Sequence, residues 1–230
     1  MARGRVARRG GRPAAVALAA LLVAGCGGGA SAPAPGALVR AADACDLAAV
    51  ERLLGAGADV DQRDGRGRTA VTAAAMHEHV EVVRRLIDAG ADVDLQDSDR
   101  NNPLLLSGEN GNVELLRAVL RADPDLTRTN RFGGTALIPA SDRGHVETVR
   151  VLLGTGIAVD HVNRLGWTAL LEAVILGDGG RAHQRIVRLL VDAGADVDLP
   201  DREGVTPLEH ARRDGHDGIA RTLERAGARG

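Results

Sequence analysis

The chain has 230 residues, with 29 basic and 31 acidic side chains and a formal net charge of −2. The first 25 residues hold five arginines and no acid, so the remainder carries 24 arginines against 31 acids, a net charge of −7. A surface of this sign repels phosphate backbones, which argues against a nucleic-acid partner. Phe132 and Trp167 are the only aromatic residues, fewer than a globular enzyme core of this length would use, whereas stacked small helices can pack on Ala, Val and Leu.

Residues 1–25 have the pattern of an export signal. Five arginines precede an apolar run at 14–25, which is too short to span a bilayer permanently. The run ends in Val-Ala-Gly-Cys at 23–26, which resembles the bacterial lipoprotein signal. That resemblance implies cleavage before Cys26 and acyl chains on Cys26, and two chains anchor a protein stably. The alternative is an ordinary signal peptide cleaved near residues 32–34, and the choice between general and twin-arginine export stays open.

Residues 26–35 are rich in Gly, Ser and Pro and are expected to form a flexible linker. The folded domain is expected to comprise residues 36–230. Cys45 lies inside that domain, and we expect it to be a small buried apolar residue.

One sequence motif recurs along the domain. Asp-Ala-Gly-Ala-Asp-Val-Asp at 88–94 is repeated letter for letter at 192–198, and a near copy occupies 55–61. Two more divergent copies end at Thr127 and Asp160, so the five ends are spaced 33, 33, 33 and 38 residues apart. A fixed period of this size indicates a stacked-repeat protein. The glycine of the motif lies where a helix needs a left-handed residue to end.

Each period predicts two helices. The first helix of each unit is expected to start near a residue that can cap it, and these starts are 36, 69, 102, 135, 168 and 206. Thr69 can cap through its hydroxyl. Asn102-Pro103 and Thr206-Pro207 place proline at the first helical position, where its missing N–H is not needed.

Two stretches carry a family resemblance. Thr206-Pro207-Leu208 and Gly144-His145-Val146-Glu147, together with the recurring Gly-Ala-Asp-Val-Asp, resemble ankyrin repeats. The resemblance covers residues 36–228 as six units. It implies an all-α solenoid of about six helix-turn-helix units, joined by β-hairpin loops along one edge. Asp123-Pro124-Asp125 departs from the pattern in the third unit. The fifth unit has five extra residues, 178–182, expected to lengthen its inter-helix turn as a binding loop or a tolerated insertion.

The histidines and acids do not form a catalytic pattern. His79, His145, His183 and His216 recur at one repeat position, and stacked helices lie about 8–10 Å apart, too far to share one metal ion. No phosphate-binding loop or catalytic triad is recognisable. We therefore expect a protein that is not an enzyme and uses no metal or cofactor.

The positions that the repeat leaves free lie mainly in the hairpins. Candidate partner-binding residues there are Arg66, Arg68, Arg100, Arg131, Phe132, Arg164, Leu165, Trp167 and Arg202. Arginine beside aromatic and apolar groups is the composition of interface centres. The basic hairpins of an otherwise acidic domain suggest an acidic docking patch on the partner.

The predicted function is a monomeric, non-catalytic interaction scaffold of the bacterial cell envelope. It would be lipid-anchored to a membrane outside the cytoplasm and would hold another protein on its hairpin and concave face. The alternative is a small-molecule or cofactor carrier that supports an envelope enzyme, with residues 178–182 as a lid. The sequence names neither the partner nor the membrane.

Overall fold

The computed structural model describes residues 33–229. The predicted signal peptide, Cys26 and most of the predicted linker lie outside the described residues. The described part contains twelve α-helices and no strand, so the expected all-α class is confirmed. None of these helices combines the length and the apolar character that a membrane crossing requires.

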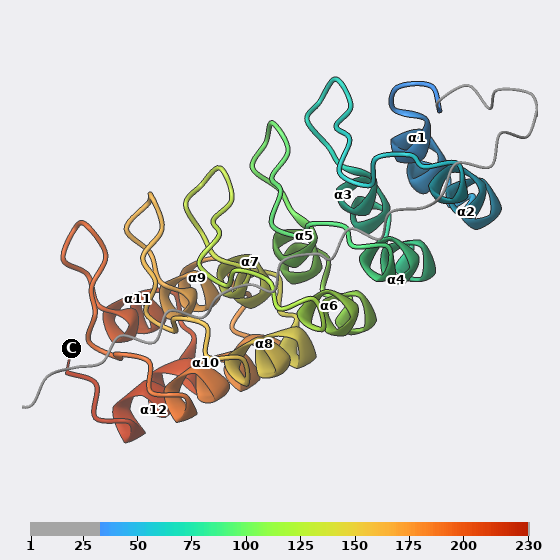
Figure 1. Cartoon of the computed structure of the whole chain (residues 1–230). Coiled ribbons are helices and arrows are strands. Elements are labelled where there is room, and N and C mark those ends of the chain that lie inside the picture. The colour runs from blue at the N-terminus through green and yellow to red at the C-terminus, as the bar shows by residue number, and fades with distance from the viewer. Residues whose placement is uncertain (1–32, 230) are drawn as a thin grey trace, which may run out of the picture. The chain divides into compact units, whose positions relative to one another are not determined.

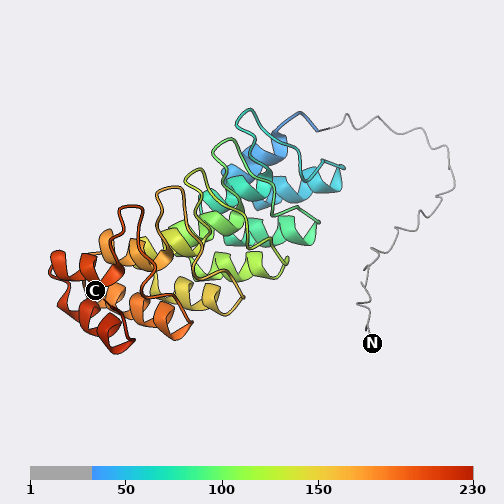
Figure 2. The same cartoon turned by 90° about the vertical axis from the view of Figure 1, so that its left-hand side faces the viewer.

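The helices form two layers, with one helix of every unit in each layer (Figure 1). The first layer consists of α1 (Ala37–Asp43), α3 (Ala70–Met76), α5 (Pro103–Asn110), α7 (Leu137–Asp142), α9 (Ala169–Ile175) and α11 (Pro207–Arg213). The second layer consists of α2 (Leu47–Gly55), α4 (Val80–Asp88), α6 (Val113–Leu120), α8 (Val146–Leu153), α10 (Arg181–Asp192) and α12 (Asp217–Arg225). Figure 2 shows the loops that precede the first-layer helices leaving the stack along one edge.

Side-chain caps start most first-layer helices where the sequence predicts. Thr69 accepts a hydrogen bond from Thr72 N at 3.3 Å, and Asn102 accepts one from Leu105 N at 2.9 Å. These bonds satisfy amide groups that have no partner inside the helix. Two helices differ: Gly36 has no side chain to cap α1, and the buried hydroxyl of Thr135 has no hydrogen-bond partner among the described residues. The helix that follows it, α7, begins one residue later than its counterparts.

An acidic or amide side chain closes each hairpin loop. In every hairpin its Oδ1 accepts the N–H groups two and four residues later, and these residues are Asp64, Asp97, Asn130, Asn163 and Asp201. A backbone bond also runs across each loop, as from Asp64 N to Arg68 O at 3.0 Å. The loops are hairpins in shape, but the structure assigns no strand in them.

The recurring motif links one unit to the next at every junction except that between the third and fourth units. Its last residue, Asp61, accepts a hydrogen bond from Asp92 N at 2.9 Å, and the corresponding Asp94 accepts one from Asp125 N. The third copy ends in Thr127, whose hydroxyl donates to Asp125 of the same unit at 2.6 Å. The third unit also has a non-glycine residue, Asp123, in the left-handed conformation at φ 51°, where the other copies have glycine. Two of the motif's structural roles are therefore altered in this unit.

The repeated histidines also connect neighbouring units. His79, His145 and His183 each donate to a backbone carbonyl of the preceding unit, at 3.1, 3.0 and 2.8 Å respectively. Their recurrence at one repeat position therefore has a packing explanation.

One local expectation was wrong and another was incomplete. Cys45 is exposed, because it occupies the turn between α1 and α2 with φ 58°. The insertion at 178–182 lengthens a helix as well as the turn, since α10 already begins at Arg181 and has 12 residues. Asp178 accepts hydrogen bonds from Gly180 N and His183 Nδ1, both at 2.8 Å, which hold the remaining turn against α10.

Candidate functional site

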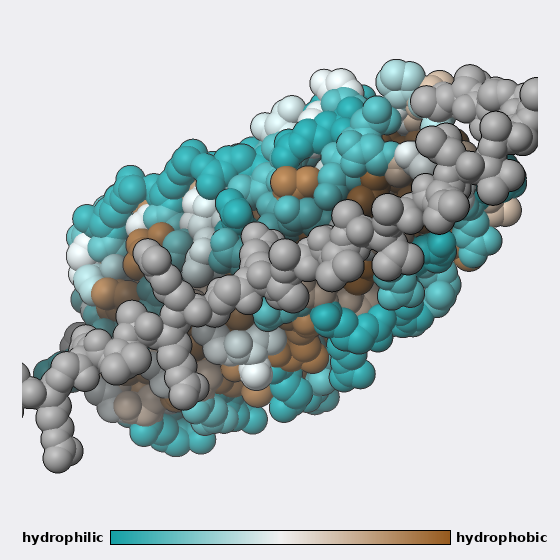
Figure 3. Space-filling view, in the orientation of Figure 1, coloured by the Kyte–Doolittle hydropathy of each residue, from teal (hydrophilic) through white to brown (hydrophobic). Residues whose placement is uncertain are grey.

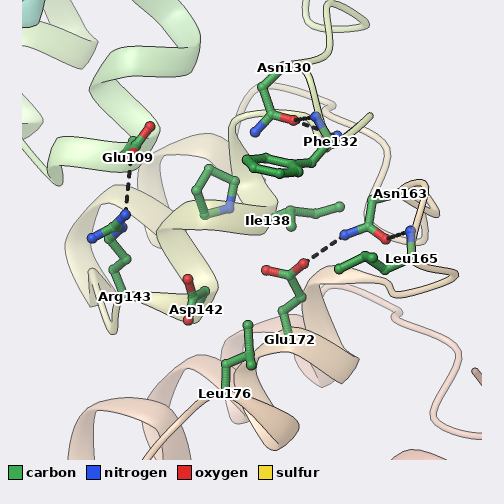
Figure 4. Close-up of a pocket in the computed structure, with 12 residues that line it drawn as sticks. Glu109, Asn130, Phe132, Ile138, Asp142, Arg143, Asn163, Leu165, Glu172 and Leu176 are labelled. Carbon is green, nitrogen blue, oxygen red and sulfur yellow. Dashed lines mark hydrogen bonds and ion pairs between the residues drawn. The ribbon is translucent and has the colours of Figure 1, made fainter.

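A pocket of about 220 Å³ opens on the hairpin side of the first helix layer, where α5, α7 and α9 meet two successive hairpins (Figure 4). Its apolar lining residues are Phe132, Ile138, Pro139, Leu165 and Leu176. Its polar lining residues are Glu109, Asn130, Asp142, Arg143, Asn163 and Glu172. The pocket therefore combines apolar walls with several carboxylates.

Three of the pocket's apolar residues are unusually exposed. Phe132, Leu165 and Leu176 are 54, 50 and 50% exposed, and only two other large apolar residues of the described part, Leu47 and Val162, are comparably exposed. In the space-filling view, hydrophobic residues otherwise form small separate patches on a largely hydrophilic face (Figure 3). A concentration of exposed apolar side chains at one place indicates a contact site.

The hairpin geometry explains why Phe132 and Leu165 are exposed. They occupy the same position in successive hairpins, 33 residues apart. Phe132 N donates to Asn130 Oδ1 and Leu165 N donates to Asn163 Oδ1, both at 2.9 Å. This turn directs both side chains away from the core and above the pocket.

Glu172, on α9, is the most buried acid in the pocket, with 7% of its surface exposed. Its Oε1 accepts a hydrogen bond from Asn163 Nδ2 at 2.6 Å. Burial raises the pKa of Glu172 to about 7, and the negative charge of Asp142 adds to the effect, whereas the bond from Asn163 opposes it. The group therefore changes charge near neutral pH.

Four of the predicted site residues lie together above this pocket. The guanidinium carbon of Arg131 lies 4.8 Å from the ring centroid of Phe132, which is a cation–π contact. On the next hairpin, Arg164 Nη1 donates to the carbonyl of Arg131 at 2.9 Å. Leu165 follows Arg164 directly in the sequence. The structure therefore places Arg131 and Phe132 of one hairpin beside Arg164 and Leu165 of the next.

The other predicted residues are separate from the pocket. Arg66, Arg100 and Arg202 are exposed on other hairpins, and Trp167 is half-buried at the base of its hairpin. Arg68 is only 12% exposed and forms ion pairs with Asp43 at 2.8 Å and Asp64 at 2.9 Å. Both ion pairs are within the fold, so the charge of Arg68 stabilises the hairpin and is not available to a partner.

A second hollow, of about 470 Å³, lies beside the hairpin of Arg66 and Arg68. Its lining includes Met76 and the acids Asp97 and Asp99. It lacks the group of exposed large apolar side chains found at the first pocket. We therefore regard the pocket around Glu172 as the better candidate site.

Sequence reasoning missed Glu172, Asp142 and Ile138. A signal for Glu172 was available, because the equivalent positions in the three preceding units hold Ala73, Leu106 and Pro139. A carboxylate at a position that is apolar in those three units marks a departure from their packing pattern, although the first and last units also hold polar residues there, Arg40 and His210. Asp142 and Ile138 carry no comparable signal.

Within residues 33–229, no group of three or more histidine, cysteine or acidic side chains is arranged to hold a metal ion. The described carboxylates of the pocket form one ion pair with a pocket arginine, between Arg143 Nη2 and Glu109 Oε1 at 3.0 Å. The arrangement suits recognition of a side chain better than bond-making chemistry, because no nucleophile with an adjacent base lies in the pocket.

Comparison with known proteins agrees with the fold. Residues 38–130 and 108–201 match the family described as ankyrin repeats in three copies. An ankyrin repeat domain from Acinetobacter baumannii AYE is 47% identical, with a TM-score of 0.81, over 84% of this chain and 98% of that one. The ankyrin repeat protein EF0377 is 39% identical, with a TM-score of 0.80, over 83% of this chain and 98% of that one.

A more distant structure has the same architecture. The ankyrin repeat domain of Bcl-3, a member of the IkappaB family, is 30% identical, with a TM-score of 0.75, over 84% of this chain and 86% of that one. No curated protein matches the chain in sequence.

Proposed function

Because this chain belongs to the ankyrin-repeat family, we propose that it is a non-catalytic scaffold that binds a partner protein over the pocket around Glu172. Ankyrin repeats generally mediate protein–protein interactions. The observation that carries the proposal is the gathering of Phe132, Leu165 and Leu176, three of the most exposed large apolar residues, around one pocket. Exposed anchors of this kind supply most of the affinity in protein interfaces.

Removing two of these anchors tests the scaffold proposal. The variant Phe132→Ala/Leu165→Ala should capture its partner at least about tenfold less than the wild-type chain in a crosslinking pull-down, because buried interface anchors are commonly worth 2 kcal/mol or more. Both side chains are half-exposed, so the helical circular dichroism should not change.

The matched control for the double variant is Leu47→Ala. Leu47 is 37% exposed and lies on α2 in the second layer, away from the pocket. It should capture the partner as the wild type does. Equal capture by the double variant and the wild type would move the interface to another surface.

The proposal includes export and a lipid anchor on Cys26. The support is the sequence of residues 1–26, where arginines, a short apolar run and a small-residue stretch precede the cysteine. A lipid anchor would place the scaffold at a membrane of the cell envelope. The linker expected at 26–35 would separate the repeats from the membrane surface.

Substituting the cysteine tests the anchor. Cys26→Ser should leave uncleaved precursor, or release the repeat domain from the membrane fraction, because the thiol that accepts the lipid is lost. Cys45→Ser is the control, since Cys45 is an exposed cysteine in the α1–α2 turn and should not affect processing. Immunoblots of membrane and soluble fractions provide the measurement, and unchanged size and location of Cys26→Ser would rule out the anchor.

The carrier alternative has less support. Pockets for small organic ligands usually enclose about 300–1,000 Å³ and have mostly apolar walls. The pocket around Glu172 encloses only about 220 Å³. The hollow of about 470 Å³ beside Arg66 is large enough, but its lining residues are mainly polar and charged. The insertion expected to act as a lid is held against α10 through Asp178 and His183. We therefore retain the protein-binding scaffold.

A further inference from the structure

The pocket around Glu172 has a charge opposite to that of the hairpin tips above it. Its lining includes three carboxylates, of Glu109, Asp142 and Glu172, and a single cation, of Arg143. Arg143 is paired with Glu109 at 3.0 Å. Among the described residues, Asp142 and Glu172 have no cationic partner within ion-pair distance, so the pocket floor is negative through Asp142 and, when it is ionised, through Glu172.

Glu172 also has an unused acceptor that faces the pocket. Asn163 occupies Oε1, but no described residue donates a hydrogen bond to Oε2. Figure 4 shows the carboxyl group of Glu172 between Ile138 and Leu176, with Asp142 on the side away from Asn163. Leaving a carboxylate 93% buried without a cation is costly unless a partner supplies one.

The apolar walls suit the stem of a long basic side chain. Lysine and arginine bury their methylene groups on apolar surface while their charged ends seek polar partners. Phe132, Ile138 and Leu176 line the pocket and provide such a surface, and the carboxyl group of Glu172 lies between Ile138 and Leu176. A glutamate or aspartate side chain would instead meet the negative floor, and a purely apolar one would leave both acids unpaired.

We propose that this pocket receives one lysine or arginine side chain from a segment of the partner protein, with its stem on Phe132, Ile138 and Leu176 and its cation against Glu172 and Asp142. The inference rests on the proposed scaffold function. Arg164 lies beside Leu165 at the rim of the pocket and forms no ion pair with a described residue, whereas Arg131 on the neighbouring hairpin is paired with Asp99 at 3.5 Å. The segment therefore carries a single basic residue among neutral or acidic neighbours, because a run of basic residues would be repelled there.

Binding of synthetic peptide libraries to the full-length chain tests this assignment. Each library has random flanks and one fixed central residue, which is Lys, Arg, Leu or Glu. The Lys and Arg libraries should be retained at least about tenfold more than the Leu and Glu libraries, because a charged hydrogen bond commonly contributes that much affinity. Glu172→Gln should reduce the preference to about twofold or less.

Glu147→Gln is the matched control, since Glu147 is an exposed acid on α8 in the other layer, and it should keep the full preference. Asp142→Asn is a second test variant that should also weaken the preference, and it serves if Glu172→Gln does not fold. Equal retention of all four libraries, or an unchanged preference in Glu172→Gln and Asp142→Asn, would overturn the inference.

Two further arms separate the alternatives. The capped amino acid Nα-acetyl-lysine amide should bind far more weakly than the Lys peptides, and equal affinity would point to a free small molecule in place of a protein segment. In the pull-down, partner capture that requires Phe132 and Leu165 but is unchanged in Glu172→Gln would leave the scaffold standing and refute the basic side chain. No capture by the wild-type chain would refute the scaffold itself.

Discussion

Replacing Gly108 with alanine should destabilise the fold by about 2 kcal/mol. Gly108 lies in α5, and a Cβ atom there would be 2.4 Å from the carbonyl oxygen of Ala136 and 3.0 Å from its Cα. These are backbone atoms at the start of α7, so they cannot rotate away as the end of a flexible side chain could. The two helices would have to separate, and overpacking of this kind costs about 1–3 kcal/mol or more. The higher helix propensity of alanine, about 1 kcal/mol, offsets only part of this cost.

Urea denaturation of Gly108→Ala and a control glycine variant measures the effect. The control is Gly55→Ala, because Gly55 ends α2 and a Cβ there would meet no atom within 4 Å. It should be as stable as the wild type or about 0.5 kcal/mol more stable. The Gly108→Ala transition should also broaden, since repeat units are stabilised by their neighbours and the third and fourth would be uncoupled. Wild-type stability in Gly108→Ala would mean that α5 and α7 can move apart freely.

The helix pattern was predictable because its causes are local. The 33-residue period identifies the unit, and capping residues such as Thr69 and Asn102 determine where its first helix begins. Proline at the first helical position of α5 and α11 also marks where these two helices begin. Thr135 shows the limit of this reasoning, because the same residue type at the same repeat position leaves its hydroxyl unpaired.

Features that depend on contacts between units were not predictable. Arg68 looks like a free hairpin arginine until Asp43, 25 residues earlier, is placed 2.8 Å from it. Cys45 was expected to be buried because cysteine usually is, but a left-handed turn exposes it. Phe132 and Leu165 were expected to be surface residues, yet only the fold shows that they border one pocket with Glu172.

At pH 8, Glu172→Gln should be more stable than the wild-type chain by about 3 kcal/mol. The pKa of Glu172 is about 7 in the fold, against an ordinary value of 4.5, because burial and the charge of Asp142 disfavour its ionised form. Between these values the folded chain holds a proton that the unfolded chain has lost, so the stability of the wild type falls as pH rises from about 4.5 to about 7 and then levels off. Each pKa unit corresponds to about 1.4 kcal/mol. Glutamine carries no charge and keeps an oxygen that can accept the bond from Asn163.

Because the pKa of Glu172 is raised in the fold, the stability difference between the wild type and Glu172→Gln should shrink as the pH is lowered. At pH 5 the folded wild type is protonated at Glu172, so its stability should lie within about 1 kcal/mol of the variant. Urea denaturation of both proteins at pH 5 and pH 8 measures the change, and other titrating groups cancel because they are common to both. Glu51→Gln, an exposed acid on α2, should show no comparable pH dependence.

A stability difference that stays constant between pH 5 and pH 8 would show that Glu172 is paired or solvated in the free protein. A difference that grows from pH 5 to pH 8, as expected, would show that the carboxylate of Glu172 lowers the stability of the free chain at neutral pH. A destabilising carboxylate such as Glu172 is expected at a binding site, because residues that serve binding often reduce the stability of the free protein. A cation delivered by the partner would remove the penalty, so the stability cost of Glu172 in the free scaffold would be recovered as affinity in the complex.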